Sequence, residues 1–193
     1  MKAENVVAIG SSTGGLVALK EVLSQLPGDL GAAIIIVQHM PGFVSKSIVS
    51  TLNEVTGLSV KLGAEGNTLE NNIVYLAPGG DRHLVIEDGI IRLIDGEKVN
   101  FCRPSVDVMM LSVAEEFGGR VVGAILTGMG DDGAGGIASI KDNGGVTIAQ
   151  DKTTSAVFGM PRAAIDTGKV DSVMPSYKIA SEIVERLKYQ GFT

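Results

Sequence analysis

The sequence predicts an α/β protein, with a doubly wound, mostly parallel sheet, helices on both faces and a small antiparallel hairpin insert. Short β-branched runs alternate with helical patterns, which is typical of βαβ units with right-handed crossovers. Hydrophobic residues make up 45% of the chain, and 26 glycines are added to that share, as suits a sheet covered on both faces. The 193 residues fall in the range of one domain, roughly 100 to 200 residues, so we expect a single domain over residues 1–193.

The pattern of apolar residues places the expected elements along the chain. Strands are expected at residues 6–9, 33–37, 121–126, 146–149 and 170–173. Helices are expected at residues 16–26, 44–55, 105–117, 135–142, 162–166 and 177–187. Residues 60–94 break the alternation, and the Asp-Gly pair within residues 87–92 indicates a hairpin. This middle segment is therefore predicted to form an antiparallel edge or flap.

Composition excludes several classes of protein. The net charge of −6 and the pI near 4.9 argue against a nucleic-acid partner, whose phosphates are neutralised by Lys and Arg. The longest apolar run, residues 32–37, is far shorter than the ~20 residues of a membrane helix, so no membrane insertion is expected. Cys102 is the single cysteine and cannot form an internal disulfide, which predicts a reducing, cytoplasmic location and ordinary packing for this thiol.

Polar residues that suit acyl transfer follow three expected strands. Ser12 follows the first strand, His39 the second, and Asp131 and Asp132 follow the strand at 121–126. Ligands of open α/β sheets bind at the carboxyl ends of strands, so these side chains are expected near one another. A serine hydroxyl needs a base to accept its proton and a carboxylate to orient that base, which predicts a serine hydrolase site.

Each of these residues also has a structural interpretation. The segment from Gly10 to Gly14 matches the G-x-S-x-G nucleophile elbow, which favours Ser12. Alternatively, a hydroxyl of the Ser11-Ser12-Thr13 run caps the following helix, and an aspartate of the pair after residue 130 caps the next one. His39 has a structural hydrogen-bonding role as its alternative, and the other histidine, His83, is expected in a surface or turn role.

Cofactor and metal sites have no support in the sequence. Gly14-Gly15 is followed by Leu16, which excludes the Gly-Lys-Ser/Thr of a P-loop. Gln38 and His39 stand where a dinucleotide fold has an acidic residue for the ribose. Two histidines and one cysteine form no metal-binding motif. We therefore expect chemistry without a metal or a cofactor.

Five blocks of sequence together resemble the catalytic domain of the chemotaxis receptor methylesterases, the CheB family. The blocks are "IGSSTGG", "VQHMP", "RPSVDVM", "ILTGMGDDG" and "VFGMPRAAI", and they follow the family's order from residue 6 to about residue 173. The resemblance implies a protein-glutamate methylesterase that hydrolyses glutamyl methyl esters on the cytoplasmic helices of methyl-accepting chemoreceptors and can deamidate receptor glutamines.

The resemblance also assigns site residues. Ser12 matches the nucleophile, with Ser11 at a position where the family has alanine, and His39 matches the base. Asp132 matches the orienting aspartate, while Asp131 replaces an asparagine and could share its role. Thr13 and Met129 match positions whose backbone N–H groups stabilise the oxyanion. The family's usual form carries a receiver domain, which we do not expect within these residues and which would belong to a longer chain.

A non-catalytic module that binds a receptor through the same fold is the alternative function. Ser12, His39 and Asp132 argue against it, because a binding module needs none of them.

Overall fold

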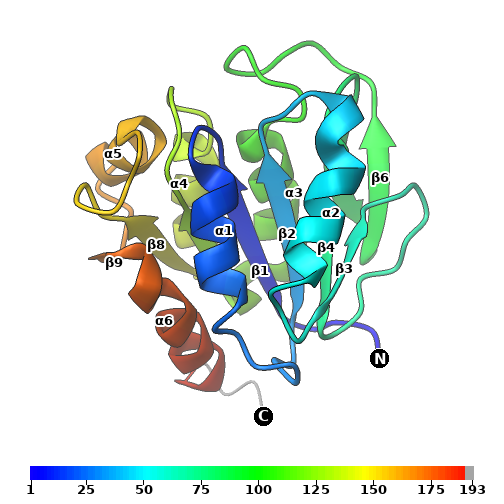
Figure 1. Ribbon diagram of the computed structural model, residues 1–193, viewed down its shortest axis with the longest axis horizontal. Helices are drawn as coiled ribbons and strands as arrows, with labels where there is room; N and C mark the ends of the chain where they lie inside the picture. Colours follow the sequence, from blue (N-terminus) through cyan, green and yellow to red (C-terminus); the bar gives the residue numbers. More distant parts are fainter. Residues whose placement is uncertain (190–193) are drawn as a thin grey trace.

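The computed structural model describes residues 1–189 and contains a parallel sheet of seven strands in the order β3-β4-β2-β1-β7-β8-β9 (Figure 1). A separate antiparallel pair, β5-β6, forms a hairpin. The strands of the large sheet are β1 (Val6–Ser11), β2 (Ala33–Gln38), β3 (Ser59–Leu62), β4 (Ile73–Leu76), β7 (Val121–Ile125), β8 (Val146–Gln150) and β9 (Ser172–Met174). The hairpin strands are β5 (His83–Glu87) and β6 (Ile90–Ile94).

Helices cover both faces of the large sheet. The α-helices are α1 (Gly15–Leu23), α2 (Ser45–Asn53), α3 (Val106–Phe117), α4 (Ala134–Asp142), α5 (Gly159–Asp166) and α6 (Ser176–Tyr189), with short 3-10 turns at Gly42–Val44 and Gly118–Arg120. In Figure 1, α1, α2 and α6 lie in front of the sheet and α3 and α4 behind it. Strand alternation divides the core accordingly: Val7 and Ile9 pack with the front helices, while Val6 and Ala8 pack with α3, α4, α5 and the hairpin.

The predicted fold class is confirmed, but part of the middle segment was interpreted wrongly. The β5-β6 hairpin is antiparallel as expected, whereas β3 and β4 pair in parallel with each other and β4 pairs in parallel with β2. Each of these two strands has only four residues, too few to reveal a period. Helix α5 begins at Gly159, earlier than expected, because Pro161 is tolerated in the first turn of a helix.

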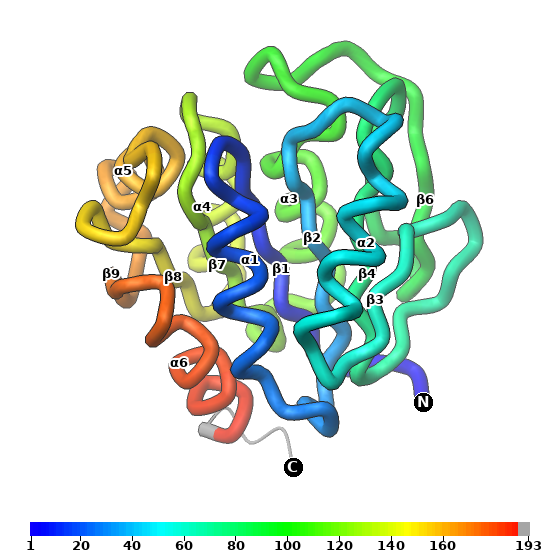
Figure 2. Tube along the Cα trace, viewed as in Figure 1, coloured from blue at the N-terminus to red at the C-terminus, as the bar shows by residue number. Residues whose placement is uncertain are grey.

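Strand order reverses between β1 and β7, and this is where the expected site residues gather. From β1 the chain continues to β2 on one side, and β7 is followed by β8 and β9 on the other. Ser12 follows β1, His39 follows β2, and residues 127–132 follow β7, so all lie at the carboxyl edge. The loop that precedes α3 arches over this edge at the top of Figure 2. Among the described residues, no helix has the length and apolar character that a membrane crossing requires.

Candidate active site

Ser12 stands in a tight turn between β1 and α1. Its N–H donates to the Thr127 carbonyl at 3.0 Å, and its carbonyl accepts from the Gly15 N–H at 2.8 Å. Gly14 has φ 79° and ψ −3°, the left-handed conformation that the third residue of a type II turn requires and that glycine adopts without strain. The turn therefore depends on Gly14, and Ser12 does not adopt the positive φ of the strained elbow serine.

The hydroxyl of Ser12 forms no hydrogen bond with any group in residues 1–189. Helix α1 has Gly14 as its N-cap and no side-chain cap, so the interpretation of Ser11, Ser12 or Thr13 as a capping residue is wrong. Ser12 is only half-buried, whereas Ser11 is fully buried. The turn thus leaves the Ser12 hydroxyl free at the carboxyl edge of the sheet.

Gln38 links the turn of Ser12 to His39. Its side-chain amide donates to the carbonyls of Ser12 and of His39, at 2.9 Å in both cases. Its carbonyl oxygen accepts from the Ser11 hydroxyl at 2.7 Å. Ser11 and Gln38 are paired across β1 and β2, so Ser12 and His39 are the next residues on neighbouring strands. Gln38 and Ser11 therefore hold the two backbones in a fixed relation, a role that the sequence analysis did not identify.

His39 and Asp132 are in direct contact. The Nε2 atom of His39 lies 2.8 Å from Oδ2 of Asp132, and the imidazole side chain is 14% exposed against 2% for the carboxylate. An ionised Asp132 accepts only, so Nε2 is assigned as the donor and Nδ1 as the free acceptor. The structure thus leaves the basic nitrogen of His39 on the side away from the carboxylate.

The amino-terminal end of α3 holds Asp132. Besides His39, its carboxylate accepts from the Val106 N–H at 2.7 Å, the Asp107 N–H at 3.1 Å and the Ser105 hydroxyl at 2.7 Å. Burial alone raises the pKa of Asp132, but the hydrogen bonds from His39, Ser105, Val106 and Asp107 outweigh it, and the pKa lies below its ordinary value. Asp132 is therefore held ionised, and it binds the amino-terminal end of α3, whose N-cap is Ser105, instead of capping the helix that follows it.

Asp107 ties the loop after β7 to the same helix end. Its Oδ1 accepts from the N–H groups of Gly133 at 3.0 Å and Gly136 at 2.6 Å. Asn100 donates to Asp107 at 2.7 Å and to Asp132 at 3.2 Å. Asn100, Ser105 and Asp107 were missed as site residues, although serine ahead of an apolar helical pattern is a capping signal.

Asp131 and the two expected oxyanion residues are exposed. Asp131 is exposed, and its side chain forms no hydrogen bond with the described part of the chain, so Asp132 is the aspartate that contacts His39. The side chain of Met129 is 70% exposed, and Thr13 is exposed as well. Within residues 1–189, the backbone N–H groups of Thr13 and Met129 donate to no other group. Both N–H groups are therefore free to bind a ligand.

His83 has a structural role, and its expected surface position is wrong. It is 2% exposed at the start of β5, and its Nε2 lies 2.9 Å from the Glu97 carbonyl. Its Nδ1 accepts from the Ser105 N–H at 3.1 Å. We expected an irregular segment around His83 because a proline and glycines precede it, and these residues indicate a turn. The strand that starts at His83 was therefore not predicted. His83 thus supports the helix end that binds Asp132.

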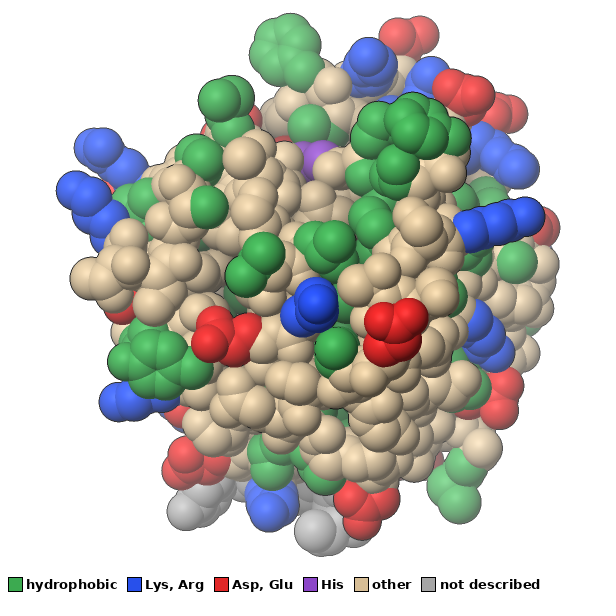
Figure 3. Space-filling view, viewed as in Figure 1, with side chains coloured by type: hydrophobic (Ala, Val, Ile, Leu, Met, Phe, Trp, Pro, Cys, Tyr) green, Lys and Arg blue, Asp and Glu red, His purple; other side chains and the backbone are tan. Residues whose placement is uncertain are grey.

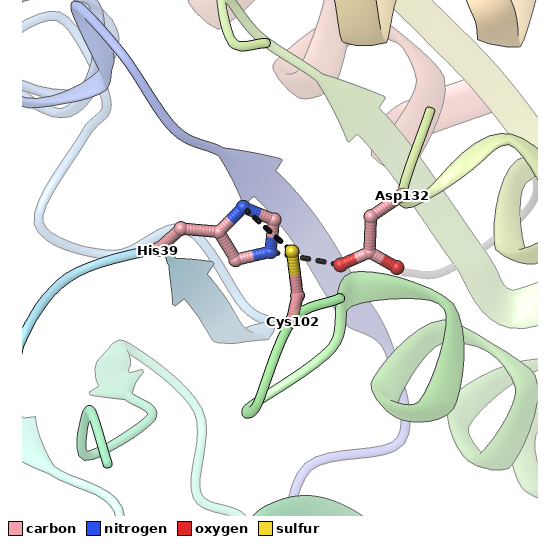
Figure 4. Close-up of side chains that lie close together, drawn as sticks. All are labelled: His39, Cys102 and Asp132. Carbon is pink, nitrogen blue, oxygen red and sulfur yellow. Dashed lines mark hydrogen bonds and ion pairs between the residues drawn. The ribbon is translucent and has the colours of Figure 1, made fainter. Parts of the chain in front are cut away.

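Cys102 lies close to the free nitrogen of His39. Its Sγ lies 3.7 Å from Nδ1, and Figure 4 shows the thiol, the imidazole and the Asp132 carboxylate close together. Burial, followed by the carboxylates of Asp132 and Asp131, raises the pKa of Cys102 to about 11. The structure therefore contains the contact of His39 with Asp132, but no hydrogen bond between Ser12 and His39. Among the described residues, His39, Cys102 and Asp132 are also the set that could hold a metal ion, with their ligand atoms within 4.8 Å of one another.

An open cleft of 410 Å³ gives access to His39. Its walls include Met40, Lys98, Cys102 and Arg103. Phe101 also lines it and is 95% exposed, with a φ of 63° that bulky residues rarely adopt. In Figure 3 a histidine is visible in a hollow with hydrophobic side chains standing at its rim. The lining therefore combines charged and apolar side chains.

We expect the protein to lose the stabilising contribution of Asp132 in acid. Its pKa in the folded state lies below the ~3.9 of an unfolded aspartate, so its stabilising contribution is present above that pH and is lost as the pH falls through the folded pKa. Asp132→Asn should lower the free energy of unfolding near pH 7 and flatten its decline below about pH 4. Urea unfolding at a series of pH values measures this, with exposed Asp131→Asn as the control. A profile for Asp132→Asn that runs parallel to that of the wild type would contradict it.

The known proteins and the family profile that match this chain describe the same kind of protein. The profile of the family described as CheB methylesterase matches residues 7–183. A protein-glutamate methylesterase/protein-glutamine glutaminase from Archaeoglobus fulgidus is 47% identical over 94% of this chain and 53% of its own length. The protein of the same name from Pyrococcus horikoshii is 44% identical over 96% of this chain and 51% of its own length. The chain thus spans about half the length of these relatives.

A solved structure has the same fold over almost all of its length. The catalytic domain of Thermotoga maritima CheB methylesterase is 40% identical and superposes with a TM-score of 0.90. The match covers 94% of this chain and 97% of that domain.

Proposed function

Because the chain belongs to the CheB methylesterase family, we propose that it is a serine hydrolase that demethylates glutamyl methyl esters on chemoreceptors. Deamidation of receptor glutamines, which the relatives' name includes, is proposed as a second reaction of the same site. The reaction takes place in the cytoplasm, where the receptor helices that the family modifies lie. The contact of His39 with an ionised, buried Asp132, at the carboxyl edge of the sheet where Ser12 also lies, is the observation that carries this proposal.

The proposed acylation step uses the free nitrogen of His39. The Ser12 oxygen attacks the ester carbonyl while Nδ1 of His39 takes the hydroxyl proton, and Asp132 stabilises the imidazolium through Nε2–H. This proton then passes to the departing methoxide, which leaves as methanol, and a glutamyl ester of Ser12 remains. Substrate binding is expected to bring the Ser12 hydroxyl within reach of Nδ1, since catalytic hydrogen bonds often tighten only when substrate is bound.

The N–H groups of Thr13 and Met129 are proposed to stabilise the oxyanion. Neither N–H has a partner among the described residues, and oxyanion donors must be free and fixed before the reaction. One such donor contributes roughly 3 to 4 kcal/mol to the stabilisation of a transition state in other hydrolases. In the second half of the reaction, water gives a proton to His39 and attacks the acyl carbonyl, which releases the receptor glutamate and restores Ser12.

The activity is tested with a receptor fragment that carries radioactive methyl esters on its glutamates. We expect the protein to release volatile radioactive methanol in proportion to enzyme concentration. The same fragment with glutamine in place of the methyl ester should release ammonia, which tests the second reaction. Binding of the methylated fragment without release of methanol would instead support a non-catalytic receptor-binding module.

Gln38 is expected to be a positioning residue for this reaction. Gln38→Leu removes the two donor bonds that join the backbones of Ser12 and His39, and it leaves the Ser11 hydroxyl buried without its partner. We expect kcat to fall by about 10- to 100-fold with KM little changed, because misplacement of reacting groups acts mainly on the chemical step. The matched control is Ser11→Ala, which keeps both donor bonds and should lower kcat by less than about ten-fold. Equal kcat values for Gln38→Leu and the wild type would rule out this role.

A further inference from the structure

Residues 99–102 form a tight hairpin turn in the loop that precedes α3. The N–H of Val99 donates to the Cys102 carbonyl at 3.1 Å, and the N–H of Cys102 donates to the Val99 carbonyl at 2.9 Å. The two residues between them, Asn100 and Phe101, have φ values of 50° and 63°. Positive φ at both central residues is the mark of a type I′ turn, for which Asn-Gly is the favoured sequence. Phe101 therefore stands where this turn favours glycine.

The phenyl ring of Phe101 gains no packing within the chain that would offset this conformation. Phe101 is 95% exposed. A positive φ brings the Cβ of any residue except glycine close to its own backbone, which costs free energy, so folding alone would favour glycine at this position. Residues held in such unfavourable conformations are concentrated at binding and catalytic sites. The ring is therefore expected to serve a contact outside the chain.

The turn is tied to the groups that orient the imidazole of His39. The side-chain amide of Asn100 donates to Oδ1 of Asp132 at 3.2 Å. On the other side of Phe101, Sγ of Cys102 lies 3.7 Å from Nδ1 of His39, as Figure 4 shows. These contacts hold Phe101 at a fixed place, and it lines the same cleft as His39.

Other exposed apolar side chains come from loops at the same edge of the sheet. Phe43 follows β2 and is 87% exposed, and Met129 follows β7 and is 70% exposed. Met40 lines the cleft together with Phe101. Large apolar side chains that are exposed at one face are typical of a surface that binds another protein. The edge that carries the site thus presents apolar groups to a partner.

The charges in the cleft favour an acidic partner. Its walls contain two cations, Lys98 and Arg103, and one carboxylate, Asp81, which lies 3.9 Å from the Arg103 guanidinium. Lys98 is exposed, and the buried Nε of Arg103 has no partner within residues 1–189. The carboxylates of Asp131 and Asp132 act on the nearby thiol but do not line the cleft. A chain with a net charge of −6 therefore has a local excess of positive charge in the walls of this cleft.

We propose that Phe101 is the anchor residue with which the enzyme docks an acidic, amphipathic helix of the receptor. The ring packs against apolar side chains of that helix, and Lys98 and Arg103 attract its glutamates. The methyl ester then enters the cleft beside His39. An amphipathic helix suits this surface because it carries apolar and charged side chains on adjoining faces. The identity of the partner rests on the proposed function, in which a receptor helix bears the ester.

Docking is tested by calorimetric titration of the methylated receptor fragment into Ser12→Ala, which does not turn over the bound ester. Adding Phe101→Gly to Ser12→Ala should weaken binding at least about ten-fold, as the loss of an aromatic anchor commonly does. Adding Phe101→Trp should keep the affinity within about three-fold, because an aromatic ring remains at the same position. The control is Leu111→Ala, which shortens an exposed side chain of α3 and should leave the affinity unchanged. Equal affinities with and without Phe101→Gly, or no binding of the fragment by Ser12→Ala, would overturn the docking role.

The stability of Phe101→Gly distinguishes a binding role from a structural one. Glycine adopts a positive φ without strain and the ring is exposed, so the midpoint of urea unfolding should move to a higher urea concentration. A more stable protein that docks more weakly is a result that damage to the folded structure cannot produce. A midpoint below that of the wild type would show that the ring supports the fold, and it would overturn the anchor role.

Two further measurements separate the proposed partner from the alternatives. Lys98→Gln should weaken binding of the fragment and reduce its dependence on salt concentration, and an unchanged salt dependence would contradict the role of charge. A wild-type dimer that Phe101→Gly dissociates, detected by sedimentation, would assign the ring to a contact between two copies of the chain and overturn the proposal. If the wild type releases no methanol, weaker binding by Phe101→Gly still supports the docking role. Methanol release together with equal affinities would support the esterase function and overturn the docking role.

Discussion

Replacing Ser12 by alanine is expected to lower kcat for methanol release by about 10⁴- to 10⁶-fold, the loss seen when other serine hydrolases lose their nucleophile. The Ser12 hydroxyl has no hydrogen-bond partner among the described residues, so its removal should leave the free energy of unfolding nearly unchanged. Steady-state methanol release and urea unfolding of the same preparation measure both quantities. A large loss of rate without a loss of stability is the expected signature of a reacting group.

The neighbouring serine provides the matched control for Ser12. Ser11 is fully buried, and its hydroxyl donates to Gln38, so Ser11→Ala should cost stability and affect the rate only modestly. If Ser11→Ala and Ser12→Ala lost activity to the same extent, the assignment of the nucleophile to Ser12 would be wrong.

Replacing His39 by glutamine is expected to lower kcat by a similar factor, about 10⁴- to 10⁶-fold, because the imidazole is the base that takes the proton of Ser12 in the proposed reaction. Glutamine retains a donor toward Asp132 and so limits the damage to the folded structure. Rates measured with the methylated receptor fragment test this expectation.

A variant of the second histidine, His83, distinguishes the loss of a catalytic group from the loss of a structural one. His83→Ala removes two hydrogen bonds of a buried side chain, to Glu97 and from Ser105, and should lower the free energy of unfolding by roughly 1 to 3 kcal/mol. The protein that remains folded should keep its kcat within about ten-fold of the wild type. A greater rate loss for His83→Ala than for His39→Gln would exchange the roles of the two histidines.

The sequence was sufficient to predict most of the fold because its signals are local. Each long strand of the sheet is a β-branched run followed by a helical pattern, and parallel strands bring their carboxyl ends to one edge. That rule alone predicted that Ser12, His39 and residue 132 would lie near one another. The parallel pairing of β3 and β4 was not predicted because four residues show no clear hydrophobic period, and because β4 also pairs with β2, which is distant in sequence.

The groups that support the site could not be predicted, because their contacts are not local. Asp132 accepts hydrogen bonds from the start of α3, more than twenty positions earlier in the chain. Cys102 was expected to serve ordinary packing, and nothing in its immediate sequence indicates that it faces His39. Gln38 was noted only as a residue that excludes a ribose site. Its actual contacts depend on the register of β1 and β2.

The central claim is that Ser12 forms a covalent ester with the substrate. A fluorophosphonate that reacts with activated serines tests it most directly, with the modified residue located by mass spectrometry of the digested protein. We predict one adduct per chain on Ser12, and its loss in His39→Gln, because the reaction requires an activated hydroxyl. An adduct on Ser11 or Cys102 with Ser12 unmodified would contradict the account.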